Sequence, residues 1–345
     1  MSEAASEAPV GVGVVGARSM VARLAVLPAL ETAPSARVVA VASRGGPVEE
    51  RWVHLDAGSY EAVIDHGDVV AVYVPLPNDL HVDVVGAAAR AGRHVLCEKP
   101  LAPDAETARE MQRVCDDHGV LLAEAWMTPF HRRWSAALDL ASAGTIGRVT
   151  HQDHCFTFTI GPEHADNYRW APEHGGGALL DVGIYTVGTA TRLFGPPDRI
   201  ENVETERAAT GVDARTTASL SWDDGRTADV VCSFIDDESQ RFELIGESGR
   251  ILVEGDAYTG GPSGEFEITV DDPGQLDAVA DRDDVEVVEQ LTDRCWRLDA
   301  GANDPYLAMV DAFGAAVSGT AEWPRPIDDA IGLLDLLDHI AAEAA

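Results

Sequence analysis

Lysine is almost absent from this chain of 345 residues: Lys99 is the one lysine among its 25 lysine and arginine residues. Arginine stays protonated at any accessible pH, whereas an amine with an ordinary pKa of about 10.4 can exchange a proton once its surroundings lower that pKa. A composition that uses arginine wherever a cation is needed indicates that position 99 needs an amine. The alternative is a lysine that persists by chance, so the neighbouring residues must decide.

Positive charge in general is scarce. The 59 acidic residues outnumber the 25 basic ones, which gives a formal charge of −34 and an isoelectric point near 4.4. The acids form short clusters, as at 116–117, 236–238 and 281–284, and no tail. Because this surface repels phosphates and anionic lipid, we expect neither nucleic acid nor a membrane as partner. The pattern is typical of adaptation to molar salt and predicts a halophilic source, with an acidic docking face as the alternative.

Long apolar runs and paired cysteines are also missing. The five cysteines are odd in number and show no CxxC spacing, which predicts free thiols in a reducing compartment. No apolar run approaches 18 residues, and residues 1–9 lack a hydrophobic signal core. We therefore expect a cytoplasmic protein, whose length and 46% apolar content favour two folded domains.

Strand and helix patterns alternate through the first third of the chain, which predicts a doubly wound parallel sheet. The expected strands are 10–15, 37–42, 69–74, 94–97 and 120–123. The expected helices are 19–30, 79–91 and a third that Asp104 caps and that runs to about His118.

Beyond Trp126, strand patterns follow one another with short turns, which predicts a large open, mostly antiparallel sheet in an α+β domain. The expected strands are 148–158, 214–222, 227–234, 240–246 and 250–253, with a loop or hairpin insertion at 255–285 and helices at 305–317 and 327–344. The predicted division is a disordered N-terminus (1–8), a dinucleotide-binding Rossmann domain (9–126) and a substrate and oligomerisation domain (127–345).

A dinucleotide fingerprint, Gly11-x-Gly13-x-x-Gly16, stands in an unusual place. Its first two glycines fall inside the expected strand, whereas the fingerprint belongs at the carboxyl end of a strand. We therefore place the nucleotide turn one step later, at Gly16, Arg18, Ser19 and Met20, where a helix opens toward the pyrophosphate. Glycine-rich turns without a nucleotide occur in many α/β proteins, so this motif alone is a moderate signal.

The end of the second strand favours NADP over NAD. An enzyme that uses NAD places an acid there to hold the ribose 2′-hydroxyl, but this strand ends in Ser43 and Arg44. A hydroxyl and a guanidinium suit a 2′-phosphate. The alternatives are NAD as cofactor, or an arginine with no ligand in a surface loop.

Four sequence runs carry a family resemblance. They are Val-Tyr-Val-Pro-Leu-Pro-Asn-Asp-Leu-His (72–81), His-Val-Leu-Cys-Glu-Lys-Pro-Leu (94–101), Glu-Ala-Trp-Met with Phe-His (124–127 and 130–131) and Gly-Gly-Gly-Ala-Leu-Leu-Asp-Val-Gly-Ile-Tyr (175–185). Together they resemble the Gfo/Idh/MocA oxidoreductase family over nearly the whole chain. The second and fourth runs lie about 80 residues apart, and their occurrence together is a specific signature of this family. Either run alone would be a weak signal.

The resemblance implies a Rossmann domain followed by an open sheet whose outer face often serves oligomerisation, hence a homodimer or homotetramer. It also implies that Lys99 lies beside the nicotinamide and the reacting carbon, where a neighbouring cation lowers the pKa of an amine. Glu98 is expected to steady Lys99. Pro77, Asn78 and His81 are expected where the cofactor crosses the sheet edge, with a buried turn as the alternative.

Asp181 and Tyr185 lie four residues apart on an expected helix and so share one face. Many relatives carry histidine at the second position, whereas tyrosine resembles the branch with glucose-fructose oxidoreductase, dihydrodiol dehydrogenase and pentose dehydrogenases. We expect Tyr185 to exchange the proton of the substrate hydroxyl, Lys99 to tune and relay it, and Asp181 to orient substrate and lysine. Either Lys99 or Tyr185 can be the immediate base. A helix cap and a core aromatic are the alternative roles of Asp181 and Tyr185.

Two further groups of residues are weaker candidates. Asn167 and Arg169 precede the glycine-rich run and are candidates to line a substrate pocket. His151, Asp153 and His154 could suggest a metal, but His154 points to the opposite strand face from the other two. We therefore expect no metal site there.

These observations predict an NADP-dependent dehydrogenase that acts on CH–OH groups of a sugar or polyol. The expected reaction oxidises C1 of an aldose, such as D-xylose or D-glucose, to the lactone. A dihydrodiol or inositol-type dehydrogenase, or a reductase of the same family, is the alternative among enzymes. An NADP-binding sensor or scaffold without turnover is the alternative among non-enzymes.

Overall fold

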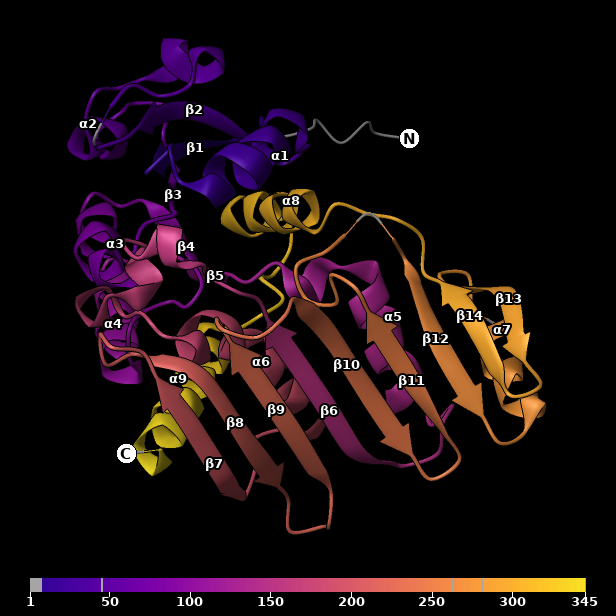
Figure 1. Cartoon of the computed structure of the whole chain (residues 1–345). Coiled ribbons are helices and arrows are strands. Elements are labelled where there is room, and N and C mark those ends of the chain that lie inside the picture. The colour runs from indigo at the N-terminus through magenta and orange to yellow at the C-terminus, as the bar shows by residue number, and fades with distance from the viewer. Residues whose placement is uncertain (1–7, 45, 262, 281, 345) are drawn as a thin grey trace, which may run out of the picture. The chain divides into compact units, whose positions relative to one another are not determined.

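The computed structural model describes residues 8–44, 46–261, 263–280 and 282–344 (Figure 1). Most of the expected disordered N-terminus, residues 1–7, lies outside this range. The chain divides into two compact units: Met1–Trp126 with Tyr306–Leu334, and Met127–Pro305 with Asp335–Ala345. A division by sequence order alone would assign residues 306–334 to the second unit.

The first unit contains a parallel sheet of five strands in the order β2-β1-β3-β4-β5. Because helices cover parallel sheets on both faces, their strands are apolar throughout, and every residue of β1 and β3 is buried. The prediction of a doubly wound fold is confirmed. The strands are β1 (Val10–Val15), β2 (Ala36–Ala42), β3 (Ala71–Val74), β4 (His94–Glu98) and β5 (Leu122–Ala125).

Helices connect these strands, and all of them except α2, which was not predicted, lie close to the predicted positions. A π-helical segment (Ala22–Val26) leads into α1 (Leu27–Thr32), and α2 (Tyr60–Ile64), α3 (His81–Arg90) and α4 (Ala105–Asp117) follow. Asp104 accepts a hydrogen bond from the Thr107 amide at 2.8 Å, so the predicted cap is confirmed. Helix α8 (Pro305–Val317) joins this unit, where Asp311 accepts a hydrogen bond from the Ser35 amide at 2.8 Å.

The second unit contains a nine-stranded sheet in the order β13-β14-β12-β11-β10-β6-β9-β8-β7. The pair β6–β9 is parallel and the other pairs are antiparallel, which confirms the predicted open, mostly antiparallel sheet. The strands are β6 (Val149–Thr157), β7 (Arg199–Arg207), β8 (Asp213–Ser221), β9 (Thr227–Ser233), β10 (Ser239–Gly246), β11 (Gly249–Glu254), β12 (Glu265–Val270), β13 (Glu286–Thr292) and β14 (Cys295–Asp299).

Two predictions about this sheet are wrong. Residues 255–285 are not simply a loop or hairpin insertion, because β12 lies within them and pairs with β11 and β14. Its sequence, Glu-Phe-Glu-Ile-Thr-Val, alternates in polarity, but the flanking glycines, prolines and aspartates obscured this pattern. The strands β7, β13 and β14 were not predicted either; β7 and β13 are the two edges of the sheet, and charged residues occupy most of β7, as they do in many sheet edges.

One face of the nine-stranded sheet is covered by helices of the same unit. Helices α5 (Arg132–Ser142) and α6 (Ile184–Phe194) pack on it, α6 against β6 and β9 and α5 against β11 and β12 (Figure 1). On the other face, β6, β8 and β10 present alternate residues that are half-buried and mostly polar. Its use for oligomerisation stays a prediction.

Helix α9 (Ile327–Glu343) is the longest helix of the described chain. Among the residues that the structure describes, no helix has both the length and the apolar character needed to cross a bilayer.

Candidate active site

The turn after β1 lies where the strand order of the parallel sheet reverses, between β1 and β3. In sheets of this order, ligands bind outside the carboxyl ends of the strands at that position. Gly16 has φ +94°, and a Cβ there would approach the Leu76 side chain to 2.7 Å and the Pro75 carbonyl oxygen to 3.2 Å. Only glycine therefore lets the two turns meet, which suits a cradle for a pyrophosphate.

The two earlier glycines of the motif serve packing. Gly11 and Gly13 both lie within β1, as predicted. A Cβ at Gly11 would collide with the Asp68 carbonyl, and one at Gly13 would come within 2.5 Å of a Val63 methyl group. Because Gly11 and Gly13 have no side chains, the backbone of β1 packs closely against the segment that precedes β3.

Residues after Gly16 begin the helical segment. Ser19 accepts a hydrogen bond from the Ala22 amide at 3.1 Å and so satisfies one of the free N–H groups at the helix start. Arg18 and Met20 are exposed beside it.

Two guanidinium groups gather at the carboxyl end of β2. Arg44 lies over the Tyr60 ring, with its Cζ 4.6 Å from the ring centroid. The Arg18 guanidinium packs against Gly46, where a Cβ would collide with it. Ser43 is half-buried next to them, and no acid occupies residues 42–46. The end of β2 therefore offers positive charge and a hydroxyl, which fits a phosphorylated ribose.

The residues after β3 form a buried turn. Asn78 is buried and Pro77 is half-buried. His81 is fully buried, with Nε2 2.9 Å from the Leu76 carbonyl oxygen and Nδ1 3.0 Å from that of Leu101. Burial lowers the pKa of His81. His81 therefore ties the turn after β3 to the segment that follows Lys99.

Lys99 stands at the carboxyl end of β4, half-buried, before a cis peptide bond to Pro100. Its backbone N–H donates to Glu98 Oε2 at 3.2 Å, and the Tyr73 hydroxyl donates to Glu98 Oε1 at 2.7 Å. Burial raises the pKa of Glu98 to about 7, although the Tyr73 hydrogen bond and the Lys99 charge act in the opposite direction. The carboxyl beside Lys99 is thus poised to titrate near neutral pH.

A buried ion pair supports the segment after Lys99. Glu124, at the end of β5, accepts a hydrogen bond from the Leu101 amide at 3.0 Å and pairs with Arg325. Arg325 also covers the Trp126 ring, with its Cζ 4.7 Å from the centroid. Sequence analysis missed this support, because Arg325 is 201 residues from Glu124 and no motif marks it.

In the second unit, Asp181 and Tyr185 lie at the start of a helix that begins with a π-helical segment, Leu179–Gly183, and continues as α6. Both side chains are buried. Such π-helical turns are frequent at functional sites, because they change which side chains face a pocket.

Arg169 makes a two-point ion pair with Asp181. Its Nε is 2.6 Å from Oδ2 and its Nη2 is 3.3 Å from Oδ1. Burial disfavours the charge of Arg169, but the Asp181 carboxylate and the nearby Tyr168 and Tyr185 rings outweigh burial and raise its pKa. Asn167, the other weak candidate, accepts a hydrogen bond from the Arg169 amide at 3.0 Å. The structure therefore brings Asn167, Arg169, Asp181 and Tyr185 together.

Tyr185 lies in an aromatic cluster. Its ring centroid is 5.2 Å from that of Phe156 and 6.2 Å from that of Tyr258. These contacts fix the position of the ring and therefore of its hydroxyl.

Asp213 of β8 holds the helix start, and sequence analysis did not name it. Its Oδ2 accepts a hydrogen bond from the Leu179 amide at 2.7 Å. Gly177, with φ +121°, leaves room for this carboxylate, because a Cβ would collide with Asp213 Oδ1. The glycine-rich run thus makes room for Asp213. No motif in the sequence links this run to β8, so the contact could not be predicted.

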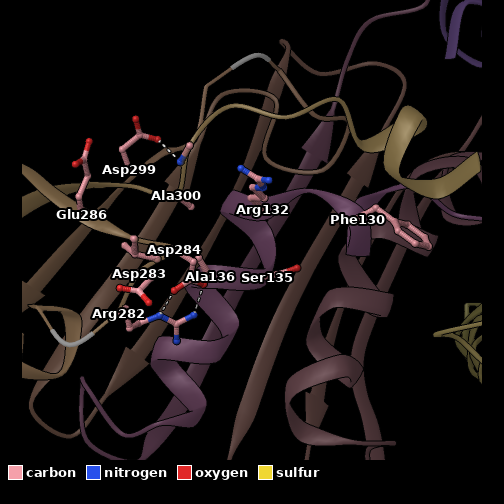
Figure 2. Close-up of a pocket in the computed structure, with 12 residues that line it drawn as sticks. Phe130, Arg132, Ser135, Ala136, Arg282, Asp283, Asp284, Glu286, Asp299 and Ala300 are labelled. Atoms are coloured by element: carbon pink, nitrogen blue, oxygen red, sulfur yellow. Dashed lines mark hydrogen bonds and ion pairs between the residues drawn. The ribbon is translucent and has the colours of Figure 1, made fainter. Parts of the chain in front are cut away.

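The second unit also has a cavity of about 730 Å³ between the start of α5 and residues 282–286 (Figure 2). Arg282 lines it and is held by Asp284 through hydrogen bonds of 2.8 and 2.6 Å. Arg132, Asp283 and Asp299 also line this cavity. None of the predicted site residues lines this cavity, and its acidic lining residues outnumber its arginines.

Two family models match the chain. The NAD-binding Rossmann fold of the oxidoreductase family matches residues 10–125, and the Gfo/Idh/MocA C-terminal domain matches residues 134–252. The chain belongs to the Gfo/Idh/MocA oxidoreductase family. It is an NAD(P)-dependent oxidoreductase, as the four sequence runs implied.

Individual members of the Gfo/Idh/MocA family are similar over long stretches. D-xylose 1-dehydrogenase (NADP(+)) 2 of Haloferax volcanii is 34% identical over 325 residues, covering 92% of this chain and 93% of that protein. The dTDP-3,4-didehydro-2,6-dideoxy-α-D-glucose 3-reductase of Actinomadura kijaniata is 34% identical over 258 residues, covering 73% and 77%. A 3-ketoreductase from Actinomadura kijaniata, solved with NADP and TDP-benzene, has a TM-score of 0.83 at 27% identity and covers 97% and 98%.

Proposed function

We propose that this protein is an NADP-dependent sugar dehydrogenase that oxidises C1 of an aldose, such as D-xylose or D-glucose, to the lactone. The observation that carries the proposal is the buried helix start of the second unit, where Tyr185 lies beside the Arg169–Asp181 ion pair. The phenolate form of a tyrosine held there can accept the proton of a substrate hydroxyl, as dehydrogenation requires. The similarity to the xylose dehydrogenase over 92% of the chain supports this substrate class.

In this proposal, residues of the first unit hold NADP. Gly16, Arg18, Ser19 and Met20 receive the pyrophosphate at the helix start, and Ser43 and Arg44 receive the 2′-phosphate. Pro77, Asn78 and Glu98 shape the sheet edge near Lys99, and His81 acts by holding two turns together. The bound nicotinamide would supply the hydride acceptor.

The proposed proton path uses Tyr185 and Lys99, and two further side chains position the reacting groups. Tyr185 takes the proton of the substrate hydroxyl, and Lys99 tunes the phenol and relays the proton. Asp181 orients the substrate, and Arg169 holds its carboxylate with two hydrogen bonds.

A reductase of nucleotide-linked keto sugars is the second candidate. The 34% identity to the dTDP-hexose 3-reductase and the TM-score of 0.83 to the 3-ketoreductase favour it. The two reactions run in opposite directions and differ in substrate size, so one assay can separate them.

The test is turnover by the full chain in molar KCl. NADP is offered with a panel of aldoses, inositols and diols, and NADPH is offered with dTDP-linked keto sugars. NADPH formation with one aldose, together with silence on the keto sugars, supports the dehydrogenase. NADPH consumption by the keto sugars alone supports the reductase, and tight NADPH binding with no turnover at all supports a sensor.

Arg44→Ala tests the cofactor assignment. We expect it to weaken NADP binding at least about 10-fold and leave NAD binding nearly unchanged, because a guanidinium–phosphate pair is lost. Arg37→Ala, at an exposed arginine earlier in β2, is the control. Fluorescence titration with both cofactors measures the effect, and equal losses for NADP and NAD would contradict the assignment.

A further inference from the structure

Three acidic residues lie side by side on the face of the nine-stranded sheet that α5 and α6 leave uncovered. Pairing of β10, β6 and β9 sets Glu243, Asp153 and Asp229 in register across three adjacent strands. Like charges directly opposite one another destabilise a sheet unless a cation lies close to them. Arg250 supplies that cation for Glu243, at 2.9 Å.

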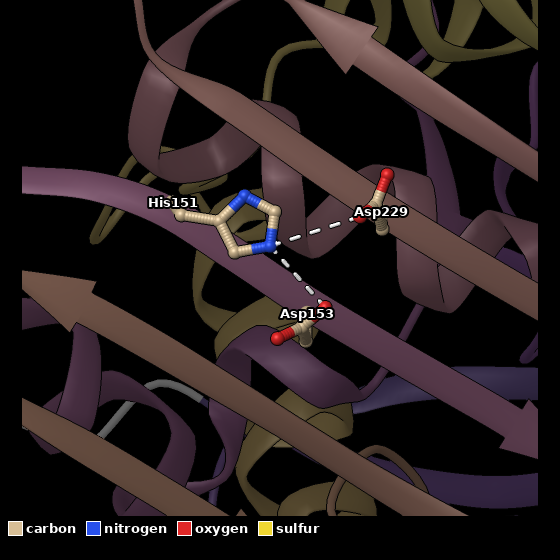
Figure 3. A group of neighbouring side chains, drawn as sticks. All are labelled: His151, Asp153 and Asp229. Atoms are coloured by element: carbon tan, nitrogen blue, oxygen red, sulfur yellow. Dashed lines mark hydrogen bonds and ion pairs between the residues drawn. The ribbon is translucent and has the colours of Figure 1, made fainter. Parts of the chain in front are cut away.

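Asp153 and Asp229 have a different neighbour. Within the described part of the chain, no arginine pairs with either of them, and His151 faces both. Its Nε2 is 3.3 Å from Asp153 Oδ1 and 3.8 Å from Asp229 Oδ2. Figure 3 shows the ring between the two carboxylates. One ring nitrogen thus faces two carboxylates, while a neutral histidine can direct at most one hydrogen toward them.

We propose that His151, Asp153 and Asp229 bind a divalent transition-metal ion of the Zn²⁺ type. One ligand atom from each residue lies within 4.8 Å of the other two. Around a tetrahedral zinc with bonds of about 2.1 Å, neighbouring ligand atoms are about 3.4 Å apart. The two distances from His151 Nε2 fall close to that spacing.

The ligand types select the class of metal. An imidazole nitrogen with two carboxylate oxygens suits Zn²⁺ and its neighbours in the first transition row, whereas Mg²⁺ prefers six oxygens in a strict octahedron. Three protein ligands on an open sheet face leave the fourth position to water.

Two hydroxyl groups hold the ligands in place. Thr227 Oγ1 lies 2.7 Å from His151 Nδ1, which fixes the ring and leaves Nε2 for the metal. The Ser219 hydroxyl donates to Asp229 Oδ1 at 2.6 Å. Such outer hydrogen bonds orient metal ligands in proteins and raise their affinity. The parallel register of β6 and β9, which sets His151 opposite Thr227 and Asp153 opposite Asp229, makes the arrangement rigid.

This site revises the expectation of no metal near His151. His154 does lie on the other face, buried between Tyr258 and Gln152, and takes no part. The third ligand is instead Asp229, which only the pairing of β6 with β9 brings to Asp153. None of the three ligands belongs to the residues proposed for hydride transfer.

The test is Zn²⁺ binding by the full chain, stripped of metal with a chelator and titrated calorimetrically in molar salt. We expect one saturable equivalent of Zn²⁺ that a tenfold excess of Mg²⁺ does not displace. His151→Gln and Asp153→Asn should each weaken it at least about 10-fold. His164→Gln is the matched control, because His164 also lies 3.8 Å from a carboxylate, that of Glu163, and should bind as the unaltered chain does.

Thermal melting gives a second measurement that does not depend on activity. Without metal, Asp153→Asn should melt at a higher temperature than the unaltered chain, because it removes the repulsion from Asp229. Zn²⁺ should raise the melting temperature of the unaltered chain and leave that of Asp153→Asn unchanged. Absence of a saturable equivalent in the folded unaltered chain, or equal binding by His151→Gln, would overturn the proposal.

Discussion

Packing against Phe156 and Tyr258 fixes the ring of Tyr185, so its proposed role in proton exchange rests on the hydroxyl. Tyr185→Phe removes the hydroxyl and keeps the ring. We expect kcat to fall about 100-fold, the usual contribution of a positioned general base, while NADPH binding is unchanged. Steady-state rates and fluorescence titration measure the two effects.

The control for this variant is Tyr258→Phe, at a tyrosine of the same cluster whose hydroxyl donates to the Arg241 carbonyl at 2.9 Å. It should lower stability and leave kcat within a few-fold. Equal kcat values for Tyr185→Phe and the unaltered chain would exclude the hydroxyl from the chemistry.

Glu98 should make stability depend on pH in a window near neutrality. Burial raises its pKa from 4.5 to about 7, so the folded state binds the proton more tightly than the unfolded state. The stabilisation is fully present below pH 4.5 and is lost as the pH rises through 7. The full shift corresponds to about 3 kcal/mol.

Glu98→Gln removes this titration. We expect the unfolding free energy of the unaltered chain, measured against that of Glu98→Gln, to decline between pH 4.5 and 7. Urea unfolding at constant molar salt measures both, since high salt screens the surface carboxylates. Parallel pH profiles for the two proteins would contradict an elevated pKa.

At the scale of elements, the helix start at residues 177–185 depends on glycine. Gly177→Ala would place a methyl group against Asp213, at a backbone φ of +121°. We expect a loss of about 2–4 kcal/mol in unfolding free energy, because both the collision and the backbone strain contribute.

Gly195→Ala separates these contributions. Gly195 ends α6 with φ +75° and has no atom near the position of a Cβ. With ψ −175° it lies in a backbone region that is essentially restricted to glycine, so the substitution should cost about 1–3 kcal/mol from strain alone. Denaturant unfolding of both variants measures the difference, and equal losses would mean that the contact with Asp213 does not matter.

Elements were predictable where the local pattern was unambiguous. The buried runs of the parallel strands and the Asp104 cap follow from the sequence, because each is decided within a few residues. Asp213 under Gly177, Arg325 beside Glu124 and Asp229 beside Asp153 could not be predicted. In each case the two residues are far apart in the sequence and are brought together by strand pairing or by a later segment that packs against an earlier one. Such long-range contacts produce no periodic pattern in the sequence.

At the scale of the whole molecule, 25 basic residues cannot neutralise 59 acidic ones. Many of the ion pairs are exposed, such as Arg199 with Asp223, and exposed pairs contribute little to stability. The remaining repulsion acts over about 10 Å at 0.1 M salt and about 3 Å at 1 M. Salt should therefore stabilise the folded chain.

We expect the melting temperature to rise steadily between about 0.1 M and about 2 M KCl, as screening shortens the range of repulsion. Differential scanning calorimetry measures it, with a neutral osmolyte of equal osmotic strength as the control. A melting temperature that is flat in KCl, or that rises equally with the osmolyte, would contradict adaptation to molar salt.

In the proposed reaction, hydride leaves C1 of an aldose for NADP. D-xylose deuterated at C1 can be supplied with NADP to the full chain in molar KCl, and the nucleotide analysed by mass spectrometry. We expect deuterium in the NADPH formed and an unlabelled lactone as product. NADPH that forms without deuterium, or no NADPH at all from this sugar and from similarly labelled D-glucose, would contradict it.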